Sequence, residues 1–288
     1  MPAASLPVAR LAPILFVFLW STGFLGAKFG LPHAAALAFL SVRYLLVLAL
    51  MTSLALLFRA PWPGDARQWL HIGVAGLLVH GVYLGGVFVA ISMSLPAGVA
   101  SLIVGLQPLL TATVAGRLLG ENVLPRQWFG LLLGFVGVAL VLSNKLGAGF
   151  GVEALWPAVA ALLGITAGTL YQKKFCPHFD WRTGAVAQFL PTALVTAAVM
   201  LAQGDFRIDW TREFVFALGW LVLVLSLGAI SLLNWLIRHA SAVNVASLFY
   251  LTPPTTALLA WVLFGETLTG LALAGMAIAV WGVYLSRR

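Results

Sequence analysis

Charged residues are scarce in this sequence. Of its 288 residues, 16 are Lys or Arg and 8 are Asp or Glu, which together make 8%, whereas soluble domains have about 25%. Hydrophobic residues make up 62%, and the mean hydropathy is +1.04. A chain of this composition has too little polar surface to cover one soluble core. It cannot be an ordinary soluble, disordered or disulfide-scaffold protein, and an integral membrane protein is expected.

Cysteine and the common catalytic motifs are also missing. Cys176 is the only cysteine, which excludes an intrachain disulfide and a Cys-based metal cluster. There is no His-Glu-x-x-His, no Gly-x-Ser-x-Gly and no phosphate-binding Gly-Lys-Ser/Thr loop. We therefore expect neither an enzyme nor an ATP-driven pump, and no cofactor or metal. If the protein moves a solute across the membrane, the energy would come from a substrate gradient, an ion gradient or exchange.

Carboxylates are absent from the middle of the apolar segments. All eight lie in loops or at expected helix ends: Asp65, Glu121, Glu153, Asp180, Asp205, Asp209, Glu213 and Glu266. Exporters of cationic drugs commonly use a buried Asp or Glu for the proton and the cation. The lack of such a residue argues against lipophilic cations as substrates. It also removes the carboxylate pair that acid/base hydrolysis needs.

Ten apolar segments divide the chain, each close to the roughly 20 residues of a transmembrane helix. They span residues 11–30, 35–58, 69–92, 97–118, 123–143, 154–174, 182–202, 214–237, 243–264 and 268–286. Strands of a membrane barrel would be about half as long and alternate in polarity. The first segment is long for a signal peptide, and no clear cleavage site follows it. We expect an all-α membrane protein of ten helices, with the first one retained.

The basic residues predict the orientation in the membrane. The net charge is +8, but the basic residues lie between apolar segments, so no nucleic-acid partner is expected. With ten spans, eleven Lys and Arg fall on the side of the termini and four on the other side, while Arg43 lies within the second span. Positively charged loops stay inside. Both termini are therefore predicted to be cytoplasmic.

An internal repeat is visible at an offset of 145 residues. Pro108 matches Pro253, Gly120-Glu121 matches Gly265-Glu266, and Gly130 and Gly137 match Gly275 and Gly282. Each copy, 1–146 and 147–288, holds five expected helices. Because five is odd, the copies must enter the membrane from opposite sides. Such inverted repeats are typical of secondary transporters, with the substrate near the midplane between the halves.

Several motifs in both copies resemble a known family. They are Trp20-Ser21-Thr22-Gly23-Phe24, Phe39-x-x-x-Arg43-Tyr44, Gln107-Pro108-Leu109, Leu119-Gly120-Glu121 and Leu263-Phe264-Gly265-Glu266. Together they resemble the drug/metabolite transporter superfamily in its EamA-type ten-helix branch, and in particular the YddG-type aromatic amino-acid exporters. The resemblance implies efflux across a bacterial-type inner membrane. It also implies a central cavity lined by helices one to four and six to nine, with helices five and ten at the periphery.

Polar and aromatic residues inside the spans are the candidate substrate-binding residues. Arg43 could bind a substrate carboxylate or tie neighbouring helices together. The lone His80 could relay a proton or simply pack. Aromatic rings could hold an apolar substrate or fill the core, and uncharged polar groups could line a cavity or join helices. The full set is Trp20, Arg43, His80, Tyr83, Gln107, Tyr171, Gln188, Ser231, Asn234 and Tyr250.

Other polar and small residues have structural interpretations. Lys173 and Lys174 are expected to be orientation charges. Glu121 and Glu266 are expected to cap the following helix or pair with a local base, although a gate could use them. Gly130 and Gly134 are expected to pack within one protomer, with a dimer contact as the alternative.

The sequence therefore predicts an alternating-access exporter of small neutral amino acids, including aromatic and large apolar ones. Its partners would be the small-molecule substrate and the lipid bilayer, and we expect a monomer. The alternatives are an exporter of another metabolite or a drug, and a membrane receptor or scaffold.

Overall fold

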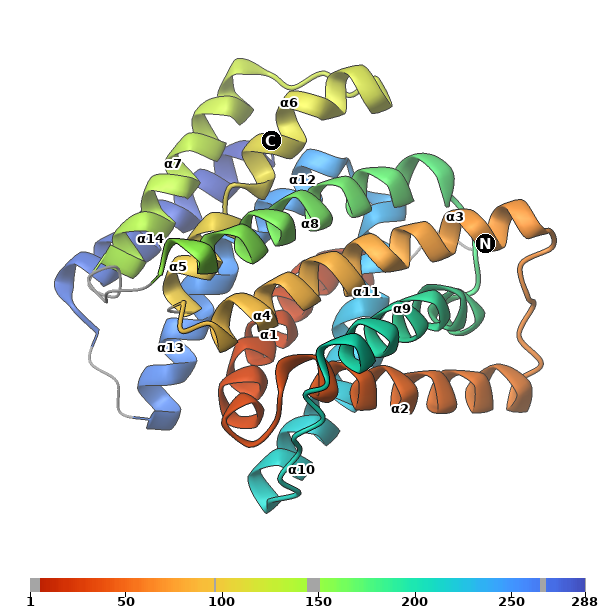
Figure 1. Ribbon diagram of the computed structural model, residues 1–288. Coiled ribbons are helices and arrows are strands. Elements are labelled where there is room, and N and C mark those ends of the chain that lie inside the picture. Colours follow the sequence, from red (N-terminus) through yellow and green to blue (C-terminus); the bar gives the residue numbers. More distant parts are fainter. Residues whose placement is uncertain (1–5, 96, 144–150, 265–267, 288) are drawn as a thin grey trace.

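The computed structural model describes residues 6–95, 97–143, 151–264 and 268–287, and within these the named elements are helices joined by loops, with no strand (Figure 1). Within this described part, nine helical segments are long and apolar enough to cross a membrane, and Gly270–Ser286 is a shorter apolar helix in the tenth expected place. In chain order the elements are α1 (Leu6–Gly30), η1 (Leu31–His33), α2 (Ala36–Leu57), α3 (Ala66–Gly76), η2 (Leu77–Leu84), α4 (Gly85–Ser92), α5 (Ala97–Val104), α6 (Gln107–Leu119), α7 (Pro125–Leu142), η4 (Val152–Ala154), α8 (Leu155–Phe175), α9 (Trp181–Gln203), α10 (Arg212–Trp220), η5 (Leu221–Ala229), α11 (Ile230–His239), α12 (Ala242–Ser247), η6 (Leu248–Leu251), α13 (Thr252–Phe264) and α14 (Gly270–Ser286).

The connections between the helices gather at two faces. At the terminal face, which we name for the end of α14, Thr183 donates to the carbonyl of Pro61, Gln68 to that of His178, and Gln127 to that of Ser286. At the opposite face, Ala34 and Ile208 form an isolated antiparallel bridge. The helices run between these faces, as the ten expected spans require.

Pairs of helices from the two halves of the chain pack against each other. α2 lies along α9, α1 contacts η5, and α8 contacts η2. α7 packs along α14 on one side of the molecule (Figure 1), away from the contacts between α1 and η5. Glycines permit this close approach: a Cβ on Gly137 would lie 2.4 Å from the backbone nitrogen of Ala279. The α7–α14 pair therefore occupies the position expected for the fifth and tenth spans.

Irregular segments recur at matching positions in the two halves. The π-helix η2 covers Leu77–Leu84 and the π-helix η5 covers Leu221–Ala229, so η5 starts 144 and ends 145 residues after η2. The fourth span breaks between α5 and α6, and the ninth contains the 3₁₀ turn η6 between α12 and α13. π-helical turns are rare and are often found at functional sites. Each π-helix has one buried side, with Tyr83 of η2 and Leu225 of η5 among its buried residues, and faces the interior, where a substrate site of an inverted repeat would be.

The outer surface carries the side chains expected in contact with lipid. Trp62, Trp156, Trp181 and Trp210 are exposed near helix ends, as is typical of residues at membrane interfaces. Many Leu, Val and Phe side chains between the ends of the helices are also exposed. The polar side chains Arg43, His80, Gln107, Gln188 and Asn234 are buried instead.

Candidate functional site: a buried aromatic cavity around Arg43

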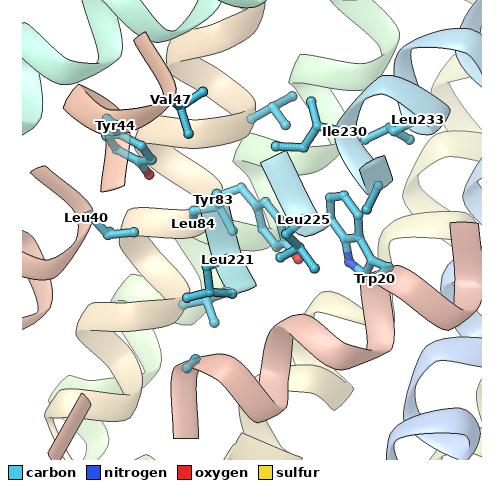
Figure 2. Packing of buried hydrophobic residues seen from close by; sticks show 14 of the residues in the cluster. Trp20, Leu40, Tyr44, Val47, Tyr83, Leu84, Leu221, Leu225, Ile230 and Leu233 are labelled. Atoms are coloured by element: carbon cyan, nitrogen blue, oxygen red, sulfur yellow. The ribbon is translucent and has the colours of Figure 1, made fainter. Parts of the chain in front are cut away.

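A small cavity lies between α1, α2, η2, α4, η5 and α11. Its volume is about 30 Å³, enough for one or two water molecules. Its described lining residues are Trp20, Gly23, Ala27, Arg43, Tyr83, Leu84, Val87, Phe88, Leu225 and Ile230. Both π-helices contribute, since Tyr83 and Leu84 belong to η2 and Leu225 to η5. Figure 2 shows Trp20, Tyr83 and Leu225 gathered from three elements that are distant in sequence.

Aromatic rings form one wall of this cavity. The rings of Trp20 and Tyr83 are stacked, with centroids 6.3 Å apart and planes 10° from parallel. Phe249 meets Trp20 edge to face at 5.3 Å, and Phe16 meets Trp20 at 5.2 Å. Such contacts hold the indole in one orientation. The wall is a rigid apolar surface suited to a planar or large apolar side chain.

Arg43 supplies the positive charge of the cavity. Its side chain is 1% exposed. Its Nη2 and Nε donate to the hydroxyl of Ser226 at 3.2 and 3.4 Å, while its Nη1 has no hydrogen-bond partner among the described residues. No acidic side chain is among the described residues that line the cavity. A buried arginine without a counterion is costly, by several kcal/mol, and an anion would relieve this cost.

Three further predicted residues belong to a polar network next to the cavity. Nε2 of His80 lies 3.5 Å from Oε1 of Gln188, and the Gln188 amide donates to Oε1 of Gln172 at 2.9 Å. The Gln172 amide donates to Oδ1 of Asn234, also at 2.9 Å. The His80 ring stacks on Phe189 at 4.2 Å. The network joins η2, α9, α8 and α11, so it ties the two halves together toward the terminal face.

The remaining predicted residues lie elsewhere. Tyr171 is near the terminal face, with its hydroxyl 2.7 Å from Nδ1 of His71. Tyr250 is fully buried and packs against Gly134 of α7. Ser231 is half-buried in α11. Gln107 lines a separate small cavity. The structure thus brings Trp20, Arg43 and Tyr83 together, and it places these four residues outside that group.

Sequence reasoning did not single out Ser226, Gln172 or Phe249. Ser226 is a polar residue near the middle of the eighth span, and a polar side chain at such a position could have marked it as a candidate. Gln172 is followed directly by Lys173 and Lys174, so it resembled part of a helix end. Phe249 is next to Tyr250 in the 3₁₀ turn η6, and only the backbone path decides which of these two rings faces Trp20.

Glu121 departs from its expected local role as a cap of the following helix. Its carboxylate accepts hydrogen bonds from the backbone nitrogen of Ala242 at 2.8 and 3.0 Å, so it binds the start of α12 and not that of α7. Its Oε1 lies 3.9 Å from Nζ of Lys173. Lys173 therefore has specific partners in addition to any effect on orientation. Glu266, the matching acid, lies outside the described residues.

Both faces of the molecule are joined across the two halves. The backbone nitrogen of Ala35 donates to the carbonyl of Arg207 at 2.9 Å, and that of Asp209 to the carbonyl of His33 at 2.7 Å. Beside these bonds a hollow of about 710 Å³ lies at the opposite face, lined in part by Ala34, Val89 and Asp205. Phe88, the neighbour of Val89, lines the small central cavity.

Comparison with known proteins gives the class of this fold and then the family. A solved crystal structure of a protein aligns with a TM-score of 0.79 at 22% identity, covering 97% of this chain and 96% of the other, which shows that the fold is shared. The EamA-like transporter family matches residues 9–143 and again residues 153–288. The chain is a member of the EamA-like transporter family, within the drug/metabolite transporter superfamily.

Named relatives cover nearly the whole chain at low identity. A probable amino-acid metabolite efflux pump of Salmonella typhimurium is 27% identical over 95% of this chain and 92% of its own length. The uncharacterized inner membrane transporter YedA of Escherichia coli is 26% identical over 93% and 86%. The uncharacterized transporter YvbV of Bacillus subtilis is 27% identical over 97% and 92%. The protein is therefore a multi-pass transporter of the cytoplasmic membrane, and the family and the names of its relatives indicate export and not catalysis.

Proposed function

We propose that this transporter exports small neutral amino acids, including aromatic and large apolar ones, from the cytoplasm. The observation that carries the proposal is Arg43, which is buried beside an aromatic wall with Nη1 unpaired among the described residues. A guanidinium forms two parallel hydrogen bonds with a carboxylate. The substrate carboxylate would bind Arg43, and its side chain would lie against Trp20 and Tyr83.

The charge of the cavity favours an amino acid over a cationic drug. Arg43 is the only charged side chain among the described lining residues, and it would repel a lipophilic cation. The remaining described lining is apolar or aromatic, which suits a large side chain better than a sugar or a nucleotide. The relatives named as amino-acid metabolite efflux pumps support the same substrate class.

The transport cycle would be alternating access between two five-helix repeats, 1–146 and 147–288, of opposite orientation. The matched π-helices η2 and η5 and the reciprocal contacts α1–η5 and α8–η2 support this arrangement. A cavity of about 30 Å³ is far smaller than the roughly 300 Å³ of typical ligand sites. The halves would therefore separate to admit the substrate. The terminal face would be the cytoplasmic one, as its basic residues predict.

Counterflow in proteoliposomes tests the proposal. Vesicles loaded with unlabelled phenylalanine, methionine or threonine are tested for uptake of the labelled amino acid. Exchange is expected for the parent protein and for Arg117→Gln, a control at an exposed arginine. Arg43→Gln should raise the half-saturating concentration at least tenfold, because it removes the charge that holds the carboxylate. Exchange of quaternary ammonium compounds without any exchange of amino acids would overturn the proposal.

A further inference from the structure

A second polar cavity lies nearer the terminal face, between α6, α8, α11 and α12. It has a volume of about 10 Å³, close to the minimum for one water molecule. Its polar lining comes from Gln107, Thr169 and Lys173. Among the described residues it shares no lining side chain with the cavity around Arg43. The two cavities are thus separate compartments in this conformation.

Gln107 points to a ligand for this second cavity. Its side chain is fully buried, and neither its Nε2 nor its Oε1 has a hydrogen-bond partner within the described part of the chain. Buried amides are almost always paired, because leaving their polar atoms unsatisfied is costly. The amide offers one acceptor and two donors. Gln107 is therefore poised to bind a polar group that enters the cavity.

An ion pair adjoins the same cavity. Nζ of Lys173 donates to the carbonyl of Ile237 at 3.0 Å and to the carbonyl of Ala240, and it lies 3.9 Å from Oε1 of Glu121. Glu121 in turn binds the backbone nitrogen of Ala242, which also lines the cavity. The side chains of Lys173 and Glu121 are 21% and 17% exposed. Both charges can therefore be reached from the terminal face.

An ion pair next to an unpaired amide is complementary to a zwitterion. Arg43 can bind only the carboxylate of an amino acid, because the described lining of its cavity carries no negative charge. Lys173 and Glu121 can bind the carboxylate and the ammonium group together, each replacing the opposite charge of the pair. The Gln107 amide can then supply further hydrogen bonds to either group.

We propose that Lys173, Glu121 and Gln107 form a loading site that binds the zwitterionic head group at the terminal face before the substrate reaches Arg43. This inference depends on the proposed amino-acid transport. Binding of the carboxylate draws Lys173 away from the carbonyls of Ile237 and Ala240, which frees the turn between α11 and α12 from α8. Loading is thereby coupled to opening of this face.

Sided inhibition measurements test the loading site. The full-length protein is assayed for phenylalanine exchange in inverted and in right-side-out membrane vesicles. The inhibitors are phenylalanine, phenylalaninamide, which lacks the carboxylate, and 3-phenylpropionate, which lacks the ammonium group. At the terminal face, Lys173→Met should weaken inhibition by phenylalanine at least tenfold and change inhibition by the amide less than threefold. Glu121→Gln should weaken inhibition by phenylalanine in the same way but leave inhibition by 3-phenylpropionate unchanged.

Matched variants separate binding from a structural role. Glu121→Gln keeps a carbonyl oxygen that can accept from Ala242, so the start of α12 retains a partner. Lys173→Arg should restore the preference for phenylalanine over its amide. Lys174→Met, at an exposed neighbouring lysine, should leave all three inhibition constants unchanged. At the opposite face none of these variants should alter inhibition by more than threefold.

Three results would overturn the loading site. The first is unchanged inhibition in Lys173→Met. The second is that a variant weakens inhibition by all three compounds equally. The third is that it weakens inhibition equally at both faces. The last two would show a purely structural contact. If the parent protein exchanges no amino acid at all, the proposed function fails as well. If the parent exchanges phenylalanine and only the head-group discrimination fails to change, the loading site alone is wrong.

Discussion

At the scale of single residues, burial of polar groups identifies the central cavity. Arg43 is 1% exposed and has one hydroxyl partner, Ser226, among the described side chains. A charged side chain inside the membrane costs free energy, so such a residue is expected to have a function. The stacked rings of Trp20 and Tyr83 add an apolar surface beside the charge. All three were candidates from their positions in the spans, whereas Ser226, the partner of Arg43, was not.

The partner of Arg43 can be tested separately from transport. Ser226→Ala removes the hydroxyl that accepts from Nε and Nη2 and leaves the guanidinium with fewer partners. We expect a loss of stability of about 1–3 kcal/mol, measured by thermal unfolding in detergent. Ser231→Ala, in the neighbouring helix α11, is the control and should change stability by less than about 0.5 kcal/mol. Equal stability of the two variants would show that the Arg43–Ser226 contact contributes nothing.

At the scale of helices, glycines decide which surfaces can touch. A Cβ on Gly130 would lie 2.6 Å from the backbone nitrogen of Ser286, and one on Gly282 would lie 2.4 Å from that of Gly134. The expected packing of Gly130 and Gly134 within one protomer is therefore observed along α7 and α14. In the third span, the closest contacts are those of Gly76 with the backbone of Gln188 and of Gly86 with the backbone of Pro157. Small residues can be read from a sequence, but their partners cannot.

The α7–α14 contact gives a prediction about stability. Gly137→Ala would place a methyl group 2.4 Å from the backbone nitrogen of Ala279, which forces the helices apart. Overpacking of this kind costs about 1–3 kcal/mol. Gly219→Ala in α10 meets nothing within 4 Å and should be neutral or stabilising by up to about 1 kcal/mol, because alanine favours helix. Thermal unfolding in detergent compares the two, and a Gly137→Ala variant as stable as Gly219→Ala would contradict the packing.

At the scale of the whole molecule, contacts between the halves occur at both faces while the central cavity stays small. The Ala34–Ile208 bridge joins them at the opposite face, and the hydrogen bonds from Thr183 to Pro61 and from Gln68 to His178 join them at the terminal face. Transport by alternating access needs each set of contacts to break in turn. The contacts at one face should therefore limit the whole cycle when they are made permanent.

A disulfide across the opposite face tests this requirement. Residues facing each other in an antiparallel bridge have Cα atoms about 4.5–5.5 Å apart, within the range that a disulfide spans. The exchange rate of the oxidised double variant Ala34→Cys/Ile208→Cys should be at least tenfold lower than that of the parent, and reduction of the disulfide should restore it. Burial raises the pKa of the native Cys176 thiol to about 12, so this residue should not compete. Each single-cysteine variant is the control, and unimpaired exchange with the disulfide formed would show that this face does not open.

The sequence by itself determined that the protein lies in a membrane, where its spans run, and which polar side chains those spans carry. These properties depend on local composition, because an apolar run of sufficient length is stable only away from water. Only the tertiary structure decided that Arg43 meets Ser226, that Glu121 binds the start of α12, and that Tyr250 packs on α7 while Phe249 packs on Trp20. All four of these pairs join residues more than 100 positions apart. Such pairs are chosen by helix packing and by π-helical and 3₁₀ turns that rotate side chains, and neither leaves a periodic signal in the sequence.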